Sequence, residues 1–148
     1  IGADKTGIRV SPYGAFNDMT PNYDTLNETY THLSQKLGQL GLAYIHVVDH
    51  SSMGTPEVPQ EIKKKIARAF SGTTIASGGL NKEKAIEAVD QEFGDLAAFG
   101  RKFLANPDLV YRLKNDIALN EPNPDTFYTP GKEGYTDYPF AKESVEQH

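Results

Sequence analysis

The sequence predicts an α/β fold on a parallel sheet, and within that class one half of a (β/α)8 barrel. Short β-branched or apolar runs alternate four times with longer amphipathic runs in about the first 120 residues. This alternation is typical of parallel strands joined by helices, and no pattern here indicates an antiparallel pair. A complete barrel needs roughly 250 residues. The 148 residues therefore supply about half of one.

Composition sets the class of protein. Apolar residues make up 38% of the chain, which is enough for the core of one domain. Fifteen Lys and Arg against twenty Asp and Glu leave a net charge of −5, the wrong sign for nucleic acid or an anionic membrane as a partner. The absence of cysteine excludes disulfides, thiolate nucleophiles and cysteine-bound metals, and it permits a cytoplasmic location. The longest apolar stretches have the length of strands, so we expect no membrane span.

The first βα unit is expected over residues 6–48. A strand over 6–11 is followed by a loop, and Asp24 is the expected N-cap of a helix that ends at Gly41. A second strand over 42–48 is apolar at almost every position, as expected for a parallel strand covered on both faces. The apolar stripe of the helix is formed by residues spaced three or four apart: Leu26, Tyr30, Leu33, Leu37 and Leu40.

The second and third units follow the same pattern. A helix is expected over 60–70 after a loop, with the run Lys63 to Lys65 on its solvated face. A third strand over 72–76 leads to Asn81, the expected N-cap of a helix that continues to about Gln91. The inward face of the 60–70 helix is formed by Ile62, Ile66, Ala67 and Phe70.

The fourth unit and the tail complete the chain. A strand is expected over 95–99, and Asn106 followed by proline predicts the start of a helix that continues to Ile117. The tail from about Asn120 is rich in Pro, Gly and Tyr, and we expect it to pack across another surface. At the other end, Ile1-Gly2 is typical of the end of a helix, so we expect a preceding segment and interpret the chain as part of a longer or divided protein.

Two strand ends carry residues suited to a phosphate. The third run ends in Ser77-Gly78-Gly79, and the fourth ends in Phe99-Gly100-Arg101. Glycines allow close approach of the main chain, and a guanidinium offers a bidentate contact. Barrels commonly bind phosphate after their last two strands, so we interpret the four strands as the fifth to eighth. An open sheet of the flavodoxin type, the alternative, would place its phosphate site after the first strand.

Arg9 is a charged residue in the middle of an otherwise apolar strand. One interpretation is a buried ion pair with a carboxylate on strands that this chain lacks. The other is a contact with an anionic or polarisable part of a ligand. The residues alone leave both interpretations open.

Other chemistries have little support in the sequence. His46, Asp49 and His50 are of types that bind metals, but the two histidines straddle a strand end where successive side chains alternate faces, so no metal is expected. The chain has no G-x-S-x-G elbow for acyl transfer.

Short segments spread along the chain form a distinctive ordered pattern. They are GIRVSPYG at 7–14 with Phe16-Asn17 after it, LAYIH at 42–46, AAFGR at 97–101, FLANPDL at 103–109, Phe127-Tyr128 and GYTDYP at 134–139. With these segments in this order, the chain resembles the Old Yellow Enzyme family of FMN-dependent ene-reductases over essentially its whole length. The resemblance implies hydride transfer from NAD(P)H through flavin N5 to an activated alkene.

The resemblance also implies residue roles. Arg9 would lie at the N1–C2=O side of the flavin and stabilise negative charge there, which makes it the catalytic candidate. Asn17 and Tyr128 would contact the substrate. The residues implied to hold FMN are Arg9, Ser77, Gly78, Gly79, Phe99, Gly100, Arg101, Phe127 and Tyr128. Some relatives carry a larger residue at the position of Gly79.

The family's remaining site residues lie on strands one to four, which this chain lacks. His32, His46, His50 and His148 match none of their roles and are interpreted as structural or solvated. We therefore expect the isolated chain to be inactive and its partner to be a polypeptide bearing those strands, with a second copy of this chain as the alternative. Two other functions stay open: a different phosphate-binding barrel enzyme, and a non-catalytic half-barrel that binds FMN or self-associates.

Overall fold

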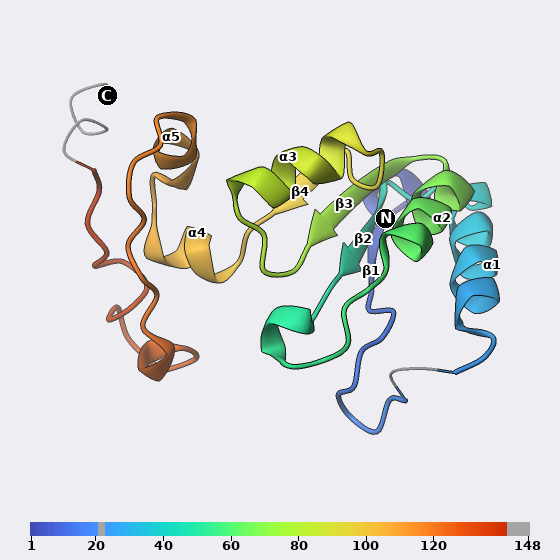
Figure 1. The fold of residues 1–148 in the computed structure, drawn as a ribbon, viewed down its shortest axis with the longest axis horizontal. Helices are drawn as coiled ribbons and strands as arrows, with labels where there is room; N and C mark the ends of the chain where they lie inside the picture. Colours follow the sequence, from blue (N-terminus) through green and yellow to red (C-terminus); the bar gives the residue numbers. More distant parts are fainter. Residues whose placement is uncertain (21–22, 142–148) are drawn as a thin grey trace. The chain divides into compact units, whose positions relative to one another are not determined.

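A computed structural model describes residues 1–20 and 23–141, which form two compact units. The first unit spans Ile1–Ala98 and the second begins at Phe99. Figure 1 labels their helices and strands. Over the described ranges, no helix combines the length and the apolar character that a membrane crossing requires.

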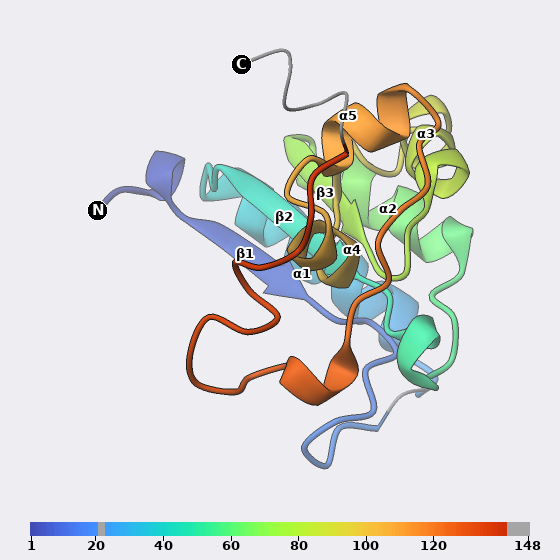
Figure 2. The same cartoon turned by 90° about the vertical axis from the view of Figure 1, so that its left-hand side faces the viewer.

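A four-stranded parallel sheet forms the centre of the first unit. Its strands are β1 (Gly7–Val10), β2 (Tyr44–Val48), β3 (Thr73–Ser77) and β4 (Leu96–Ala98). They are ordered β1-β2-β3-β4 and every neighbouring pair is parallel; in Figure 2, β1, β2 and β3 run side by side. The prediction of a parallel α/β fold is confirmed.

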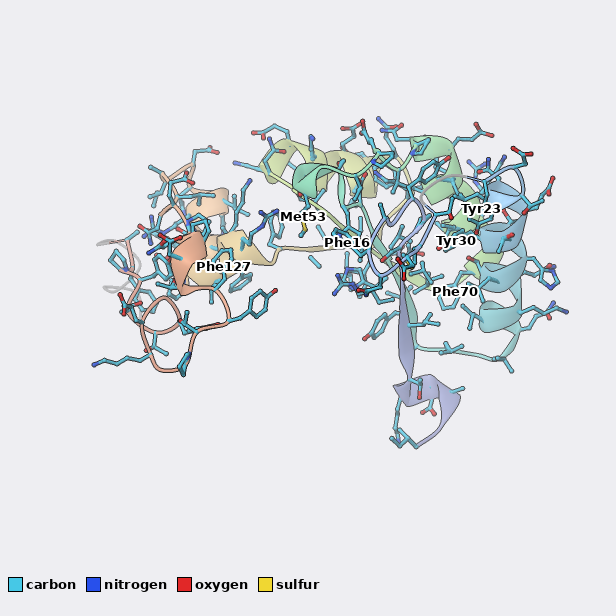
Figure 3. All side chains as sticks on the ribbon, turned by 90° about the horizontal axis from the view of Figure 1, so that it is seen from below. Phe16, Tyr23, Tyr30, Met53, Phe70 and Phe127 are labelled. Atoms are coloured by element: carbon cyan, nitrogen blue, oxygen red, sulfur yellow. The ribbon has the colours of Figure 1, made fainter. Side chains whose placement is uncertain are left out.

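Three helices accompany the sheet: α1 (Leu26–Gln39), α2 (Gln60–Phe70) and α3 (Lys82–Asp90). The main core lies between α1, α2 and one face of β1 and β2, and Tyr30 and Phe70 belong to it (Figure 3). Its buried members are Val10, Leu26, Ile45, Val47, Val58, Ile62, Ile66 and Phe70. Arg9, Tyr44 and His46 alternate with these residues, so they belong to the opposite face, which we call the open face.

The residues expected to cap the helices predict the observed helix ends with different success. Asn81 is the N-cap of α3, and its side chain accepts a hydrogen bond of 2.9 Å from the Lys84 N–H, as predicted. Asp24 is not the N-cap of α1: Thr25 precedes the helix and its side chain makes no capping bond. At the start of the chain, a 3-10 turn (Ala3–Lys5) separates Gly2 from β1.

The second unit contains α4 (Arg101–Ala105), α5 (Leu109–Lys114) and a 3-10 turn over Pro124–Thr126. The predicted N-cap at Asn106 is wrong, because Asn106 ends α4 instead, and α5 begins after Asp108. That helix also stops before Ile117. The Asn106 side chain is engaged in bonds to two other segments, which leaves it unable to cap α5.

Candidate functional site

Three loops converge at the carboxyl edge of the sheet in the first unit. The Asp49 N–H donates a 3.0 Å hydrogen bond to the Ser77 carbonyl, which joins the ends of β2 and β3. Ser11 Oγ lies 3.3 Å from His50 Nε2, which joins the ends of β1 and β2. Phe16, labelled in Figure 3, packs edge-on against the His50 ring with centroids 5.1 Å apart. Ligands of parallel α/β folds bind at this edge.

The glycine pair after β3 has positive φ values and lies close to the neighbouring loop. Gly78 and Gly79 have φ values of 118° and 60°. A Cβ on Gly78 would lie 1.9 Å from the Asp49 carbonyl oxygen, and one on Gly79 would lie 2.8 Å from Ser52 Cβ. Glycine is therefore required at Gly78, both by φ and by the Asp49 carbonyl, whereas Gly79 is constrained less strongly. The main chain is left without side chains, as a phosphate cradle needs.

Arg9 is exposed on the open face of β1. Its register partner on β2 is His46. Within residues 1–20 and 23–141, Arg9 takes part in none of the salt bridges. An exposed guanidinium on this face is available to an anionic or polarisable part of a ligand.

Asp49 organises the loop that packs under the glycine pair. Its Oδ2 accepts hydrogen bonds from Lys63 Nζ at 2.7 Å and from the Val58 N–H at 3.3 Å, and Oδ1 accepts from the Ser51 N–H at 3.0 Å. Lys63 Nζ also lies 5.8 Å from the centre of the Phe93 ring. The prediction that Lys63 belongs to a solvated lysine face is wrong, because this ion pair draws it inward.

The pKa of Asp49 is lowered although burial acts to raise it, because the bonds from Lys63 and Ser51 stabilise the carboxylate. A carboxyl group with a lowered folded-state pKa contributes stability above its unfolded pKa, and that contribution is lost as the pH falls through the folded pKa. We therefore expect a loss of stability below about pH 4 that is reduced in Asp49→Asn, measured by urea unfolding across pH.

We expect Asp49→Ala to lower the free energy of unfolding by about 3 kcal/mol, the lower end of the range for breaking a buried ion pair. The lower end applies because the Lys63 side chain keeps 16% exposure and can partly recover hydration. Glu61→Ala is the control, since it breaks an exposed pair between Glu61 and Lys65, and we expect it to change stability little. Equal effects of the two variants would contradict this assignment.

The four histidines have different surroundings. His46 Nε2 lies 2.7 Å from Ser77 Oγ, and His50 contacts Ser11, while His32 is exposed on α1. His148 lies outside the described residues. No cluster of metal-binding side chains occurs among the described residues.

Asn17, an expected substrate contact, lies in the loop after β1 with φ 53° and is exposed. The same loop borders a cavity of about 440 Å³. Among the described residues, those that line the cavity include Tyr13, Met19 and Tyr30, and Asn17 is not one of them. The role of Asn17 stays a prediction.

The second unit carries the other predicted cofactor residues. Phe99, Gly100 and Arg101 follow β4 directly in the chain, and Arg101 is the exposed first residue of α4. Phe127 is half-buried, whereas Tyr128 is 98% exposed, with its N–H bonded to the Tyr135 hydroxyl at 2.7 Å. Nothing tests their roles, which stay predictions.

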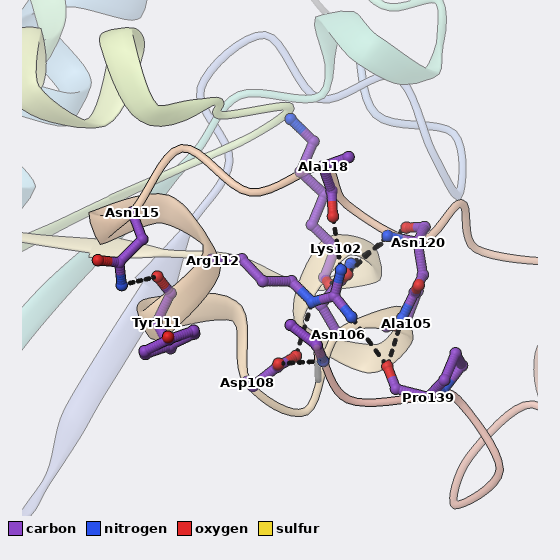
Figure 4. A network of polar contacts seen from close by, with 11 residues as sticks. Lys102, Ala105, Asn106, Asp108, Tyr111, Arg112, Asn115, Ala118, Asn120 and Pro139 are labelled. Atoms are coloured by element: carbon purple, nitrogen blue, oxygen red, sulfur yellow. Dashed lines mark hydrogen bonds and ion pairs between the residues drawn. The ribbon is translucent and has the colours of Figure 1, made fainter. Parts of the chain in front are cut away.

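A buried polar network holds the tail of the second unit (Figure 4). Arg112 Nε donates to Asp108 Oδ1 at 2.7 Å, and its other nitrogens donate to the carbonyls of Ala118 and Pro139. Asp108 Oδ2 accepts from the Ala141 N–H at 2.7 Å. The tail therefore packs back on α4 and α5. Sequence reasoning missed this pair, although its i, i+4 spacing was an available signal.

We expect Arg112→Met to cost about 3–5 kcal/mol, because Asp108 would remain buried without its partner. The Ala141 amide should then exchange its hydrogen at least about a hundredfold faster, since each 1.4 kcal/mol is about tenfold. Lys114→Met, at an exposed position of the same helix, is the control. Unchanged Ala141 exchange in Arg112→Met would show that the network does not hold the tail.

Comparison with known proteins gives concordant matches. The model of the NADH:flavin oxidoreductase / NADH oxidase family matches residues 1–120. A 12-oxophytodienoate reductase-like protein of Solanum lycopersicum is 42% identical over 147 residues, which is 96% of this chain and 38% of that protein. A Claviceps fusiformis protein described as a "probable inactive dehydrogenase" is 33% identical, over 99% of this chain and 41% of that protein.

Solved structures agree with the sequence matches. A structure of morphinone reductase in complex with tetrahydroNAD matches with a TM-score of 0.82 and 35% identity. The match covers 93% of this chain and 36% of that one. The chain thus spans about two fifths of the length of the proteins that it resembles.

Proposed function

The chain belongs to the NADH:flavin oxidoreductase / NADH oxidase family, which is the Old Yellow Enzyme family of flavoproteins, and from this we propose that it forms the phosphate-binding half of an FMN-dependent ene-reductase. The observation that carries the proposal is the carboxyl edge of the first unit. There the bare main chain of Gly78 and Gly79 follows Ser77, and Arg9 is exposed on the open face of the same sheet.

In the first unit, the bare main chain of the glycine pair and the exposed Arg9 fit FMN. The main chain at Ser77, Gly78 and Gly79 would hold the phosphate, and the family resemblance assigns Gly100 and the Arg101 guanidinium to the same group. Arg9 would stabilise negative charge at the N1–C2=O side of the ring. Phe99, Phe127 and Tyr128 would line the flavin, and Asn17 and Tyr128 would contact the substrate. When bound, FMN supplies hydride transfer at N5, between NAD(P)H and the β-carbon of an activated alkene.

We also propose that strands supplied by another polypeptide complete the barrel, with this chain as strands 5–8. Within the described residues the sheet ends at β1 on one side and β4 on the other, and such edges are normally paired or covered. The open face also leaves Tyr44 39% and Leu96 54% exposed. A cysteine-free chain suits a cytoplasmic location, which we include in the proposal.

Sedimentation tests this assembly. We expect the chain to sediment with a complementary polypeptide or, as the second candidate, as a homodimer, because closure of the barrel buries the open face. A folded monomer of 16.3 kDa without a companion would contradict the proposal.

Anaerobic spectroscopy of the assembled protein tests the activity. We expect a flavin absorption band that NAD(P)H bleaches and an activated alkene restores. A protein without a flavin band would contradict FMN binding. A flavin band without turnover would instead support a non-catalytic flavin-binding protein, the second candidate. That candidate is favoured by the match to a relative described as inactive.

A further inference from the structure

His46 lies on β2, between β1, which carries Arg9, and β3, which ends at Ser77. The proposed function assigns the flavin ring to Arg9 and the flavin phosphate to the loop that begins at Ser77. His46 is half-buried on the open face of β2, with Arg9 as its register partner on β1. Its Nε2 lies 2.7 Å from the Oγ of Ser77 at the end of β3. Ser77 is the residue directly before the glycine pair, so a bond to its side chain acts on the start of that loop.

The two contacts of Ser77 Oγ point to the nitrogen of His46 that carries the proton. Ser77 Oγ donates to the Val47 carbonyl at 3.3 Å, and a hydroxyl has only one hydrogen to donate. With that hydrogen on the Val47 carbonyl, Ser77 Oγ accepts from His46, and this arrangement requires the tautomer with hydrogen on Nε2. The Ser77 carbonyl accepts from Asp49 N–H at the same time. Ser77 is thus held through both its side chain and its main chain.

The surroundings of His46 favour the neutral ring that this tautomer requires. Burial lowers the pKa of His46, and the positive charge of Arg9 lowers it further. Arg9 is the charged group that faces it from β1, and β3 contributes the uncharged Ile75 and Ser77. Arg9 therefore remains the fixed cation of this part of the open face.

We propose that His46 is a positioning residue for the flavin phosphate: through its Nε2–H bond it fixes Ser77, and thereby the main chain of Gly78 and Gly79, beside the strand that carries Arg9. This inference rests on the proposed function. It assigns His46 no contact with the flavin and no proton transfer.

The tautomer is testable on the assembled protein without any flavin. Long-range ¹H–¹⁵N correlation spectra at pH 7 should show His46 as the neutral Nε2–H form. Ser77→Ala should shift the Nε2–H signal of His46, because the bond to Ser77 Oγ is lost, and should leave the ring signals of His32, exposed on α1, unchanged. A His46 ring with hydrogen on Nδ1, or one unaffected by Ser77→Ala, would overturn the inference.

Flavin affinity of the assembled protein tests the positioning role, with FMN and the phosphate-free riboflavin as probes. His46→Leu should weaken FMN binding about fivefold, the usual effect of one lost neutral hydrogen bond, and should leave riboflavin binding unchanged. His46→Gln, which retains a donor, should restore most of the FMN affinity. In the double variant with Ser77→Ala, His46→Leu should add no further loss, because both changes remove the same bond.

Two results would contradict this account in different ways. Equal weakening of FMN and riboflavin by His46→Leu would show a general structural role and overturn the inference. A parent protein that binds FMN no better than riboflavin would overturn the proposed phosphate site, and this inference with it, before any variant is compared.

Discussion

Arg101→Ala is expected to weaken FMN binding to the assembled protein about ten- to a hundredfold. The variant loses a charge-assisted contact to phosphate, a class of bond that contributes about 1.5–3 kcal/mol. Because the phosphate charge does not depend on the redox state of the flavin, oxidised and reduced FMN should be affected alike. Flavin fluorescence and absorption titrations measure both affinities.

The controls for Arg101 separate its geometry from its charge. Arg101→Lys should recover only part of the affinity, since an ammonium lacks the fork of a guanidinium. Arg68→Ala removes an exposed arginine in the last turn of α2. Because this turn directly precedes the start of β3, Arg68 lies away from the carboxyl edge of the sheet. FMN retention in Arg101→Ala equal to that in Arg68→Ala would show the phosphate assignment to be wrong.

Arg9→Gln is expected to lower the reduction potential of the bound flavin and to slow its reduction by the nicotinamide. Negative charge develops near N1 only on reduction, and a fixed cation favours the state that carries this charge. For a two-electron couple, about 30 mV corresponds to about 1.4 kcal/mol, so loss of one charge contact should be measurable by potentiometric titration.

The contrast between the two arginines is itself a test. Arg101 should change affinity with little effect on the potential, whereas Arg9 should change mainly the potential. Arg68→Gln is the matched control for Arg9→Gln. An unchanged potential in Arg9→Gln, with FMN content intact, would indicate that Arg9 is an ion-pair partner for the strands that complete the barrel.

Periodicity predicted the regular elements of the first unit well. The helix expected over 60–70 coincides with α2, because its apolar residues at i, i+4 and i+8 face the sheet on every turn. Strand ends shifted by one or two residues, as between the expected 42–48 and the observed Tyr44–Val48. The five-residue helix α4 was not predicted, because it is too short to establish a period.

The same patterns could not predict contacts between residues that are distant in the sequence. Lys63 was expected in solvent because its partner Asp49 lies fourteen positions away, in a loop whose course periodicity does not specify. His46 was interpreted as structural or solvated, since its bond to Ser77 depends on the register between β2 and β3. The glycine pair was identified, but its packing against the Asp49 carbonyl could be seen only in the fold.

Paired titrations of the assembled protein with FMN and with riboflavin test the central claim, that this chain supplies the phosphate-binding half of a flavin barrel. The two ligands share the ring and ribityl chain, so their difference in affinity isolates the phosphate. We predict that FMN binds at least about tenfold more tightly than riboflavin, with the difference largely removed in Arg101→Ala. Equal affinities for FMN and riboflavin in the parent protein would contradict the claim.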